Sequence, residues 1–118
     1  MIYKQTDYTM NTETKYYKLE IFIPATHLKG LQKVLYEADA GHIGNYDGCL
    51  SYYPVTGCWH SLPESKPYIG KENEFSQETE IKVETRCAAQ NLVKTVNAIK
   101  AFHPYEEPVI NIIALIDL

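Results

Sequence analysis

The segment from His103 to Pro108 concentrates side chains that could carry chemistry. Imidazole and carboxylate groups bind divalent cations, so His103, Glu106 and Glu107 are candidate metal ligands. A catalytic metal site has about three protein ligands, so at least one ligand would have to come from elsewhere in the fold or from another subunit. A thiolate among them would favour copper or zinc. The further candidates are His42, His60 and Cys49.

The same segment also has a structural interpretation. Pro104 fixes its own backbone angle and ends any helix at the residue before it. His103 and one glutamate would then hydrogen-bond around the helix end, while Tyr105 packs against the core or contacts a ligand. Both interpretations stay open at this point.

A second notable segment follows the first expected helix, between Gly41 and Cys49. Glycine and asparagine tolerate positive φ and aspartate bonds to nearby backbone, so its centre predicts a tight turn. The alternative is a contact with a small-molecule ligand or another subunit. The residues concerned are Gly44, Asn45, Tyr46 and Asp47.

Nucleophilic catalysis has little support in the sequence. Cys49, Cys58 and Cys87 are an odd number of cysteines without CxxC spacing, which predicts reduced, buried or half-buried thiols rather than disulfides. None lies beside a cationic helix start that would lower its pKa. Phosphate loops of the GxxxxGK type, GxSxG elbows and HExxH helices are missing from the sequence.

Composition limits the remaining classes. The 118 residues carry a net charge of −4 and only 11 lysines and arginines, which argues against nucleic-acid binding. The longest apolar run, 109–118, is roughly half of what a membrane-spanning helix needs. Residues 1–15 form a polar tail that does not resemble a secretory signal, so we expect no membrane association and a cytoplasmic location.

Apolar periodicity predicts the elements that must position these residues. Alternation predicts strands over 16–23 and 78–87, and apolar spacings of three and four predict helices over 26–41 and 89–102. Thr26 is the expected cap of the first helix and Gly41 its left-handed stop. Short stretches at 49–53 and 58–62 indicate a hairpin with long loops, and 109–118 a last strand.

This order, β-α-β-β-α-β with an elaborated β-hairpin and loop middle, predicts an α+β ferredoxin-like sandwich spanning 16–118 as a single domain. Both helices cover one sheet face, and the other must meet water or another molecule. The last strand is apolar on both sides, and each exposed large side chain forfeits roughly 1.5–3 kcal/mol. We therefore expect a subunit interface, or else coverage by the middle loop or tail. The interface residues would be Phe22, Val109, Ile113 and Leu115.

Three motifs in this order resemble the inserted domain of the Nif-three-like dinuclear-metal hexameric proteins. They are Gly41-His42-Ile43-Gly44-Asn45-Tyr46-Asp47-Gly48-Cys49, then Pro67-Tyr68-Ile69-Gly70, then His103-Pro104-Tyr105-Glu106-Glu107-Pro108. The resemblance covers about residues 16–118. It departs from the family at Cys58-Trp59, where the family tends to have a small polar residue and Phe.

The resemblance implies a CutA/PII-like fold, a homotrimer, and small-molecule binding in clefts between subunits. The two-metal site of the full-length proteins is built by flanking domains that are not part of this sequence. The full-length proteins are often labelled GTP cyclohydrolase homologues, and for this chain that label would be inherited from them without support from its own residues.

Three functions follow as hypotheses. The favoured one is a non-enzymatic, self-associating binding or regulatory module of unknown ligand. The others are a CutA-like divalent-metal-binding protein and a hydrolase or cyclohydrolase based on family analogy alone.

Overall fold

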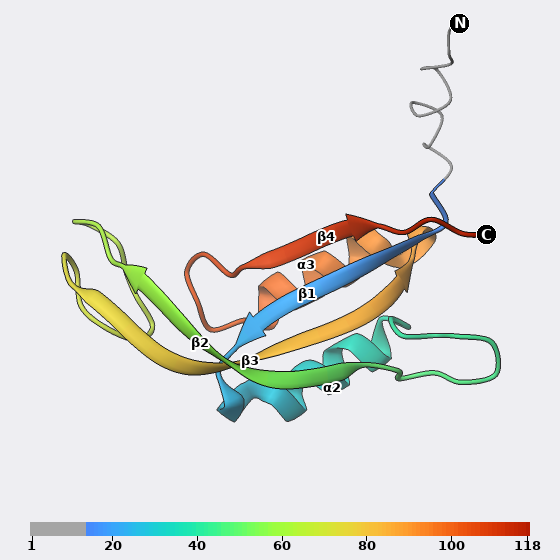
Figure 1. Cartoon of the computed structure of the whole chain (residues 1–118), viewed down its shortest axis with the longest axis horizontal. Coiled ribbons are helices and arrows are strands. Elements are labelled where there is room, and N and C mark those ends of the chain that lie inside the picture. Colours follow the sequence, from blue (N-terminus) through green and yellow to red (C-terminus); the bar gives the residue numbers. More distant parts are fainter. Residues whose placement is uncertain (1–13) are drawn as a thin grey trace, which may run out of the picture.

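The computed structural model describes residues 14–118, so the expected tail lies almost entirely outside the described residues. Four strands form one antiparallel sheet in the order β2-β3-β1-β4 (Figure 1). This is the predicted ferredoxin-like sandwich. The elements are β1 (Tyr16–Ile23), η2 (Ala25–His27), α2 (Leu28–Glu37), β2 (Ser51–His60), β3 (Phe75–Ala88), η3 (Ala89–Asn91), α3 (Leu92–Phe102) and β4 (Ile110–Ala114).

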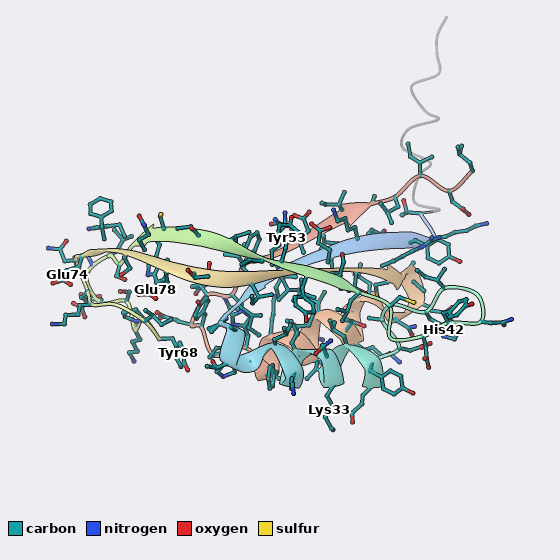
Figure 2. All side chains as sticks on the ribbon, turned by 60° about the horizontal axis from the view of Figure 1, so that its bottom comes forward. Lys33, His42, Tyr53, Tyr68, Glu74 and Glu78 are labelled. Atoms are coloured by element: carbon teal, nitrogen blue, oxygen red, sulfur yellow. The ribbon has the colours of Figure 1, made fainter. Side chains whose placement is uncertain are left out.

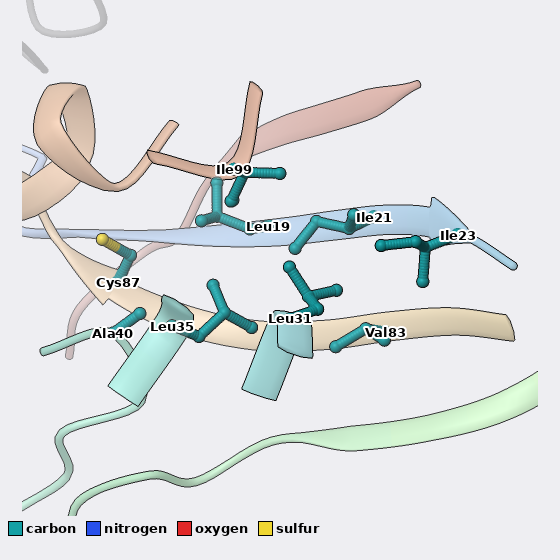
Figure 3. Close-up of a cluster of buried hydrophobic side chains, with 9 residues drawn as sticks. All are labelled: Leu19, Ile21, Ile23, Leu31, Leu35, Ala40, Val83, Cys87 and Ile99. Atoms are coloured by element: carbon teal, nitrogen blue, oxygen red, sulfur yellow. The ribbon is translucent and has the colours of Figure 1, made fainter. Parts of the chain in front are cut away.

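Both helices pack beneath the same face of the sheet, as Figure 2 shows. The core lies between them, where alternate residues of β1 meet the inward faces of α2, α3 and β3 (Figure 3). Leu19, Ile21 and Ile23 are completely buried there, as the period-two pattern of β1 predicts. The opposite sheet face, called the open face below, carries no helix (Figure 2).

The ends of α2 differ from the expectation. Thr26 does not cap the helix, because the chain first makes the 3₁₀ turn η2 after Pro24, and the Thr26 hydroxyl instead contacts Nδ1 of His27 at 2.9 Å. The helix ends at Glu37, and the first left-handed residue is Asp39, with φ 62°. Gly41 also has positive φ, but it lies beyond the helix end.

Helix α3 ends at Phe102, directly before His103 and Pro104, as predicted. Its buried residues are Thr95 and Ile99, whereas Val93, one of the apolar residues whose spacing predicts this helix, is 72% exposed. None of the helices within residues 14–118 is long and apolar enough to span a membrane.

The middle of the chain forms a longer hairpin than the sequence pattern indicated. Strand β2 is continuous through Pro54, which is tolerated because β2 is an edge strand. Strand β3 begins at Phe75 and pairs with β1 only from Ile81 onward. Residues 55–60 and 75–80 therefore project beyond the sheet as a two-stranded arm, seen at the left of Figure 1.

Strand β4 covers only Ile110–Ala114 of the predicted segment 109–118. Its pairing with β1 sets Asn111 opposite Glu20 and Ile113 opposite Lys18 on the open face. Charged residues therefore separate the apolar residues Phe22 and Val109 at one end from Ile113 and Leu115 at the other. The four predicted interface residues therefore form two separate apolar patches, because the neighbouring strands alternate in polarity even where β4 does not. Their place in a subunit interface stays a prediction.

The centre of the open face is a charge network. Lys18 lies 3.2 Å from both Glu20 and Glu84, and Lys82 lies 3.5 Å from the same two carboxylates. The Tyr53 hydroxyl donates to Glu84 at 3.0 Å, and the Asn111 amide donates to Glu20 at 3.1 Å. We call Lys18, Glu20, Lys82 and Glu84 the open-face network.

Candidate functional site

A cavity of about 490 Å³ lies where the arm, the loop 61–69 and the segment 105–109 meet the end of β1. We call it the arm cavity. Its position follows from the fold, because the arm projects past the sheet at the end where α3 returns to β4 (Figure 1). The side chains that line it include Phe22, Trp59, Tyr68, Glu80, Tyr105 and Val109.

Tyr105 is the central side chain of this cavity. Its hydroxyl donates to Oε2 of Glu80 at 2.7 Å. Its ring lies 6.4 Å from the ring of Trp59 and 5.9 Å from that of Tyr68, tilted by 46° and 49°. Burial and the hydrogen bond to Glu80 hold the pKa of Tyr105 far above its ordinary value, so it stays a neutral hydrogen-bond donor.

His103 holds the segment that carries Tyr105. Its Nε2 lies 2.6 Å from the carbonyl oxygen of Phe22, an acceptor, so Nε2 carries the proton and donates. The backbone N–H of Tyr105 donates to Nδ1 at 3.1 Å. Burial lowers the pKa of His103 below its ordinary value, outweighing the opposing effect of the Phe22 carbonyl, and favours this neutral tautomer.

Two further polar groups belong to the arm cavity. Glu106 accepts a hydrogen bond of 2.7 Å from the backbone N–H of Lys66, which ties the segment to the loop. The hydroxyl oxygen of Ser65 is buried and has no hydrogen-bond partner among the described residues. An unpaired buried hydroxyl costs about 1–3 kcal/mol, and a bound ligand with a polar group would recover this cost.

Glu80 and Gly57 are site residues that sequence reasoning missed. Glu80 belongs to the polar stripe of β3, which predicts a solvated carboxylate, but it is only 6% exposed. It reaches across β2 into the space above Gly57, where a Cβ would collide with its carboxylate. A glycine inside a strand is the signal that could have indicated such a close approach.

The metal-ligand candidates are not brought together. Both ring nitrogens of His103 are occupied by hydrogen bonds, and within residues 14–118 no three His, Cys, Asp or Glu side chains are placed to share a metal ion. His60 packs against Phe75, with ring centroids 4.6 Å apart. A site that includes His103, Glu106 and Glu107 stays a prediction without support from the described geometry.

The glycine-rich segment lies at the other end of the sheet. Figure 2 shows His42 and Tyr68 at opposite ends of the molecule. Ile43 and Tyr46 exchange backbone hydrogen bonds of 2.8 and 3.0 Å around Gly44 and Asn45, and Gly44 has φ 58°, as in a type II′ turn. Within one chain this turn cannot share a ligand with the arm cavity.

The side chains of this segment interact locally. His42 contacts Asp39 at 2.9 Å, and this hydrogen bond raises the pKa of His42. The Cys49 thiol contacts the carbonyl of Asp47, whereas Tyr46 is 74% exposed.

All three cysteines are free. Cys58 is exposed, contrary to the expectation of buried or half-buried thiols, because it lies on the edge strand within the arm, where its thiol contacts the Gln77 side chain.

Solved structures define the fold of the chain. The chain is similar to the CutA protein of Archaeoglobus fulgidus, described as a periplasmic divalent cation tolerance protein, with a TM-score of 0.63, 18% identity, and coverage of 85% of this chain and 83% of that one. CutA1 of Ehrlichia chaffeensis matches with a TM-score of 0.66 and 18% identity over 89% of this chain and 85% of its own. The chain is therefore a ferredoxin-like domain of the CutA/PII type.

Sequence comparison narrows this class. A Bacillus cereus protein described as related to NIF3 matches with a TM-score of 0.74 and 29% identity over 88% of this chain and 26% of its own. GTP cyclohydrolase 1 type 2 homologs of Halalkalibacterium halodurans and Mycobacterium leprae are 38% and 35% identical over 82% and 84% of this chain. No family model matches. The chain corresponds to one domain of the Nif-three-like proteins and spans about a quarter of the relatives' length, 26% of each.

Proposed function

We propose that this chain is a self-associating binding module that catalyses no reaction, with the arm cavity as its ligand site. The observation that carries the proposal is a cavity of about 490 Å³ formed around the His103–Pro108 motif. This volume lies within the range of about 300–1,000 Å³ typical of small-molecule sites. The unpaired Ser65 hydroxyl supplies a polar anchor in an otherwise mainly apolar lining.

The arrangement of reactive groups supports binding rather than catalysis. Among residues 14–118, no cysteine hydrogen-bonds to a histidine, so a thiol and base pair is missing there. The most buried histidine, His103, uses both ring nitrogens to hold the cavity wall. The activity named for the full-length relatives is not part of the proposal, because this chain matches only a quarter of them.

Native mass spectrometry after incubation with a small-metabolite extract tests the binding site. We expect small-molecule adducts on the chain that disappear in Ser65→Trp, because the indole fills the arm cavity. The matched control is Val93→Trp, on the exposed side of α3, which should keep the adducts. Circular dichroism verifies that both variants fold. Absence of adducts, or adducts that persist in folded Ser65→Trp, would contradict the proposal.

Self-association is supported by the edge strand β4, where Ile112 and Ile113 are 46% and 42% exposed, and by Val109 just before it, which is 51% exposed. Apolar side chains along an unpaired strand edge favour contact with another chain. We expect a trimer in the native mass spectrum and smaller species for Ile113→Lys. The control Val93→Lys should leave the oligomer unchanged. A monomeric unmodified chain would contradict this part of the proposal.

A further inference from the structure

The arm cavity contains a buried carboxylate without a counter-ion. Glu80 is 6% exposed, and its carboxylate accepts a hydrogen bond from the neutral hydroxyl of Tyr105. No lysine or arginine of residues 14–118 forms an ion pair with it, unlike Glu20 and Glu84 on the same sheet face. Burying a carboxylate is unfavourable unless a positive charge compensates for it. Within residues 14–118, the charge of the Glu80 carboxylate therefore has no compensating positive charge.

The aromatic residues of the cavity present ring faces at fixed angles. Trp59 and Tyr68 flank Tyr105, with the tilts and ring separations given above. The face of an aromatic ring carries partial negative charge and attracts a cation within about 6 Å of its centre. Tyr105 is held in place from both ends, by Glu80 at its hydroxyl and by His103 at its backbone. Such a wall is ordered before any ligand arrives.

The other residues that line the arm cavity disfavour negatively charged ligands. Glu106 and Glu107 line the cavity together with Glu80, and none of the described lining residues is lysine or arginine. A phosphate or carboxylate ligand would meet carboxylates and no cation. Ile69 and Val109 offer apolar surface beside the rings, which suits a hydrocarbon body.

We infer that the arm cavity binds a small organic cation, an ammonium or guanidinium group carried on an apolar body. The cationic group lies against the rings of Trp59, Tyr68 and Tyr105 and compensates for Glu80. This inference rests on the proposed binding function and adds the chemical class of its ligand.

Trp59 is the single tryptophan of the chain, so its fluorescence reports on the cavity directly. The probes are phenylethylammonium, 2-phenylethanol and 3-phenylpropionate, which share a phenyl body and differ in charge. Each is titrated at constant ionic strength and neutral pH. We expect a saturable change of Trp59 emission with the ammonium, binding about tenfold weaker for the alcohol, and no binding of the carboxylate.

The variant Glu80→Gln tests the role of the charge. Glutamine retains an acceptor for the Tyr105 hydroxyl, so the wall stays in place while the negative charge is lost. We expect about tenfold weaker binding of phenylethylammonium and unchanged binding of 2-phenylethanol. The matched control is Glu74→Gln, an exposed carboxylate directly before the same strand and outside the cavity, which should leave both affinities unchanged (Figure 2).

The outcomes separate this inference from the proposed function. Equal binding of the ammonium and the alcohol, or no effect of Glu80→Gln, overturns the cation inference and leaves a binding module in place. If none of the three probes binds but metabolite adducts that depend on the cavity are seen, the cation inference is likewise overturned and the binding module stays in place. Failure of the probes without such adducts overturns both. Trp59 emission that changes on dilution, with no response to a probe, shows that a second copy covers the cavity and also overturns both.

Discussion

The open-face network and the arm cavity place carboxylates of the same sheet face in opposite environments. In the network, Glu20 and Glu84 each lie within 3.5 Å of two lysines. In the cavity, Glu80 lies two residues before Lys82 on β3, yet its carboxylate accepts a hydrogen bond from Tyr105. The network is a self-compensated surface, whereas the cavity retains unmatched negative charge. Polar and apolar residues alternate along β3 through both the network and the cavity. The difference therefore arises from the segments that pack over the strand at Glu80.

The pKa values follow the same division. Hydrogen bonds from Tyr53 and Lys18 lower the pKa of Glu84, and hydrogen bonds from Asn111 and Lys18 lower that of Glu20. In the cavity wall, burial raises the pKa of Tyr105 and lowers the pKa of His103, so both side chains favour their neutral forms. A ligand that approaches the network meets paired charges, whereas one that enters the cavity meets a carboxylate that it can neutralise.

The largest expected effect comes from removing the support of the cavity wall. His103→Ala loses the hydrogen bonds to Phe22 and Tyr105 and leaves the part-buried Phe22 carbonyl without this donor, so we expect the free energy of unfolding to fall by about 3 kcal/mol. Urea denaturation measures this change. The control His42→Ala, at an exposed position, should leave the urea midpoint unchanged. Equal losses in the two variants would show that His103 does not organise the wall.

A smaller effect is expected from filling the space beneath Glu80. In Gly57→Ala the new Cβ occupies the position of the Glu80 carboxylate, which must move away from Tyr105. We expect the free energy of unfolding to fall by about 1–2 kcal/mol. The Trp59 emission should also shift, because the neighbouring Tyr105 ring loses the hydrogen bond from its hydroxyl to Glu80. Combining Gly57→Ala with Glu80→Ala should restore most of the stability. Failure of this restoration would show that the clash lies elsewhere.

Acid should weaken the two regions at different pH values. The folded-state pKa of His103 lies below its ordinary value of 6.5, so its contribution is present above pH 6.5 and is lost as pH falls below it. The lowered pKa of Glu84 means that its contribution is present above pH 4.5 and is lost only as pH falls further. The free energy of unfolding, measured from pH 8 to pH 4, should therefore decline first below pH 6.5, where His103 of the cavity wall takes up a proton, and only later where Glu84 does.

Two variants assign these pH windows. His103→Gln should abolish the decline that begins at pH 6.5, and Glu84→Gln should reduce only the one below pH 4.5. The reverse assignment would contradict the placement of His103 in the wall.

The smallest effect tests charge compensation directly. Glu80→Gln removes an uncompensated buried charge and keeps its hydrogen bond, so stability should be unchanged within about 0.5 kcal/mol or increase. Glu84→Gln leaves Lys18 and Lys82 with one carboxylate fewer, so its urea midpoint should fall. A larger loss for Glu80→Gln than for Glu84→Gln would show that the cavity carboxylate is compensated after all.

Much of the fold could be predicted because it follows from local patterns. The alternation in β1 and Pro104 after α3 determine their elements with bounds close to those observed, since period and proline geometry act within a few residues. The cap at Thr26 was predicted wrongly because a 3₁₀ turn takes the place of the cap. The break in β2 was predicted wrongly because an edge strand accepts Pro54.

By itself, the sequence determined the order of elements, the motif around Tyr105, and the resemblance to Nif-three-like proteins. Only the tertiary structure decided that the Gly44 turn and Tyr105 lie at opposite ends of the sheet, and that Glu80 leaves the polar stripe to line a cavity. Whether a carboxylate meets a lysine or an aromatic ring depends on strand register and on the twist of the arm. Both are set by long-range pairing, which no local pattern encodes.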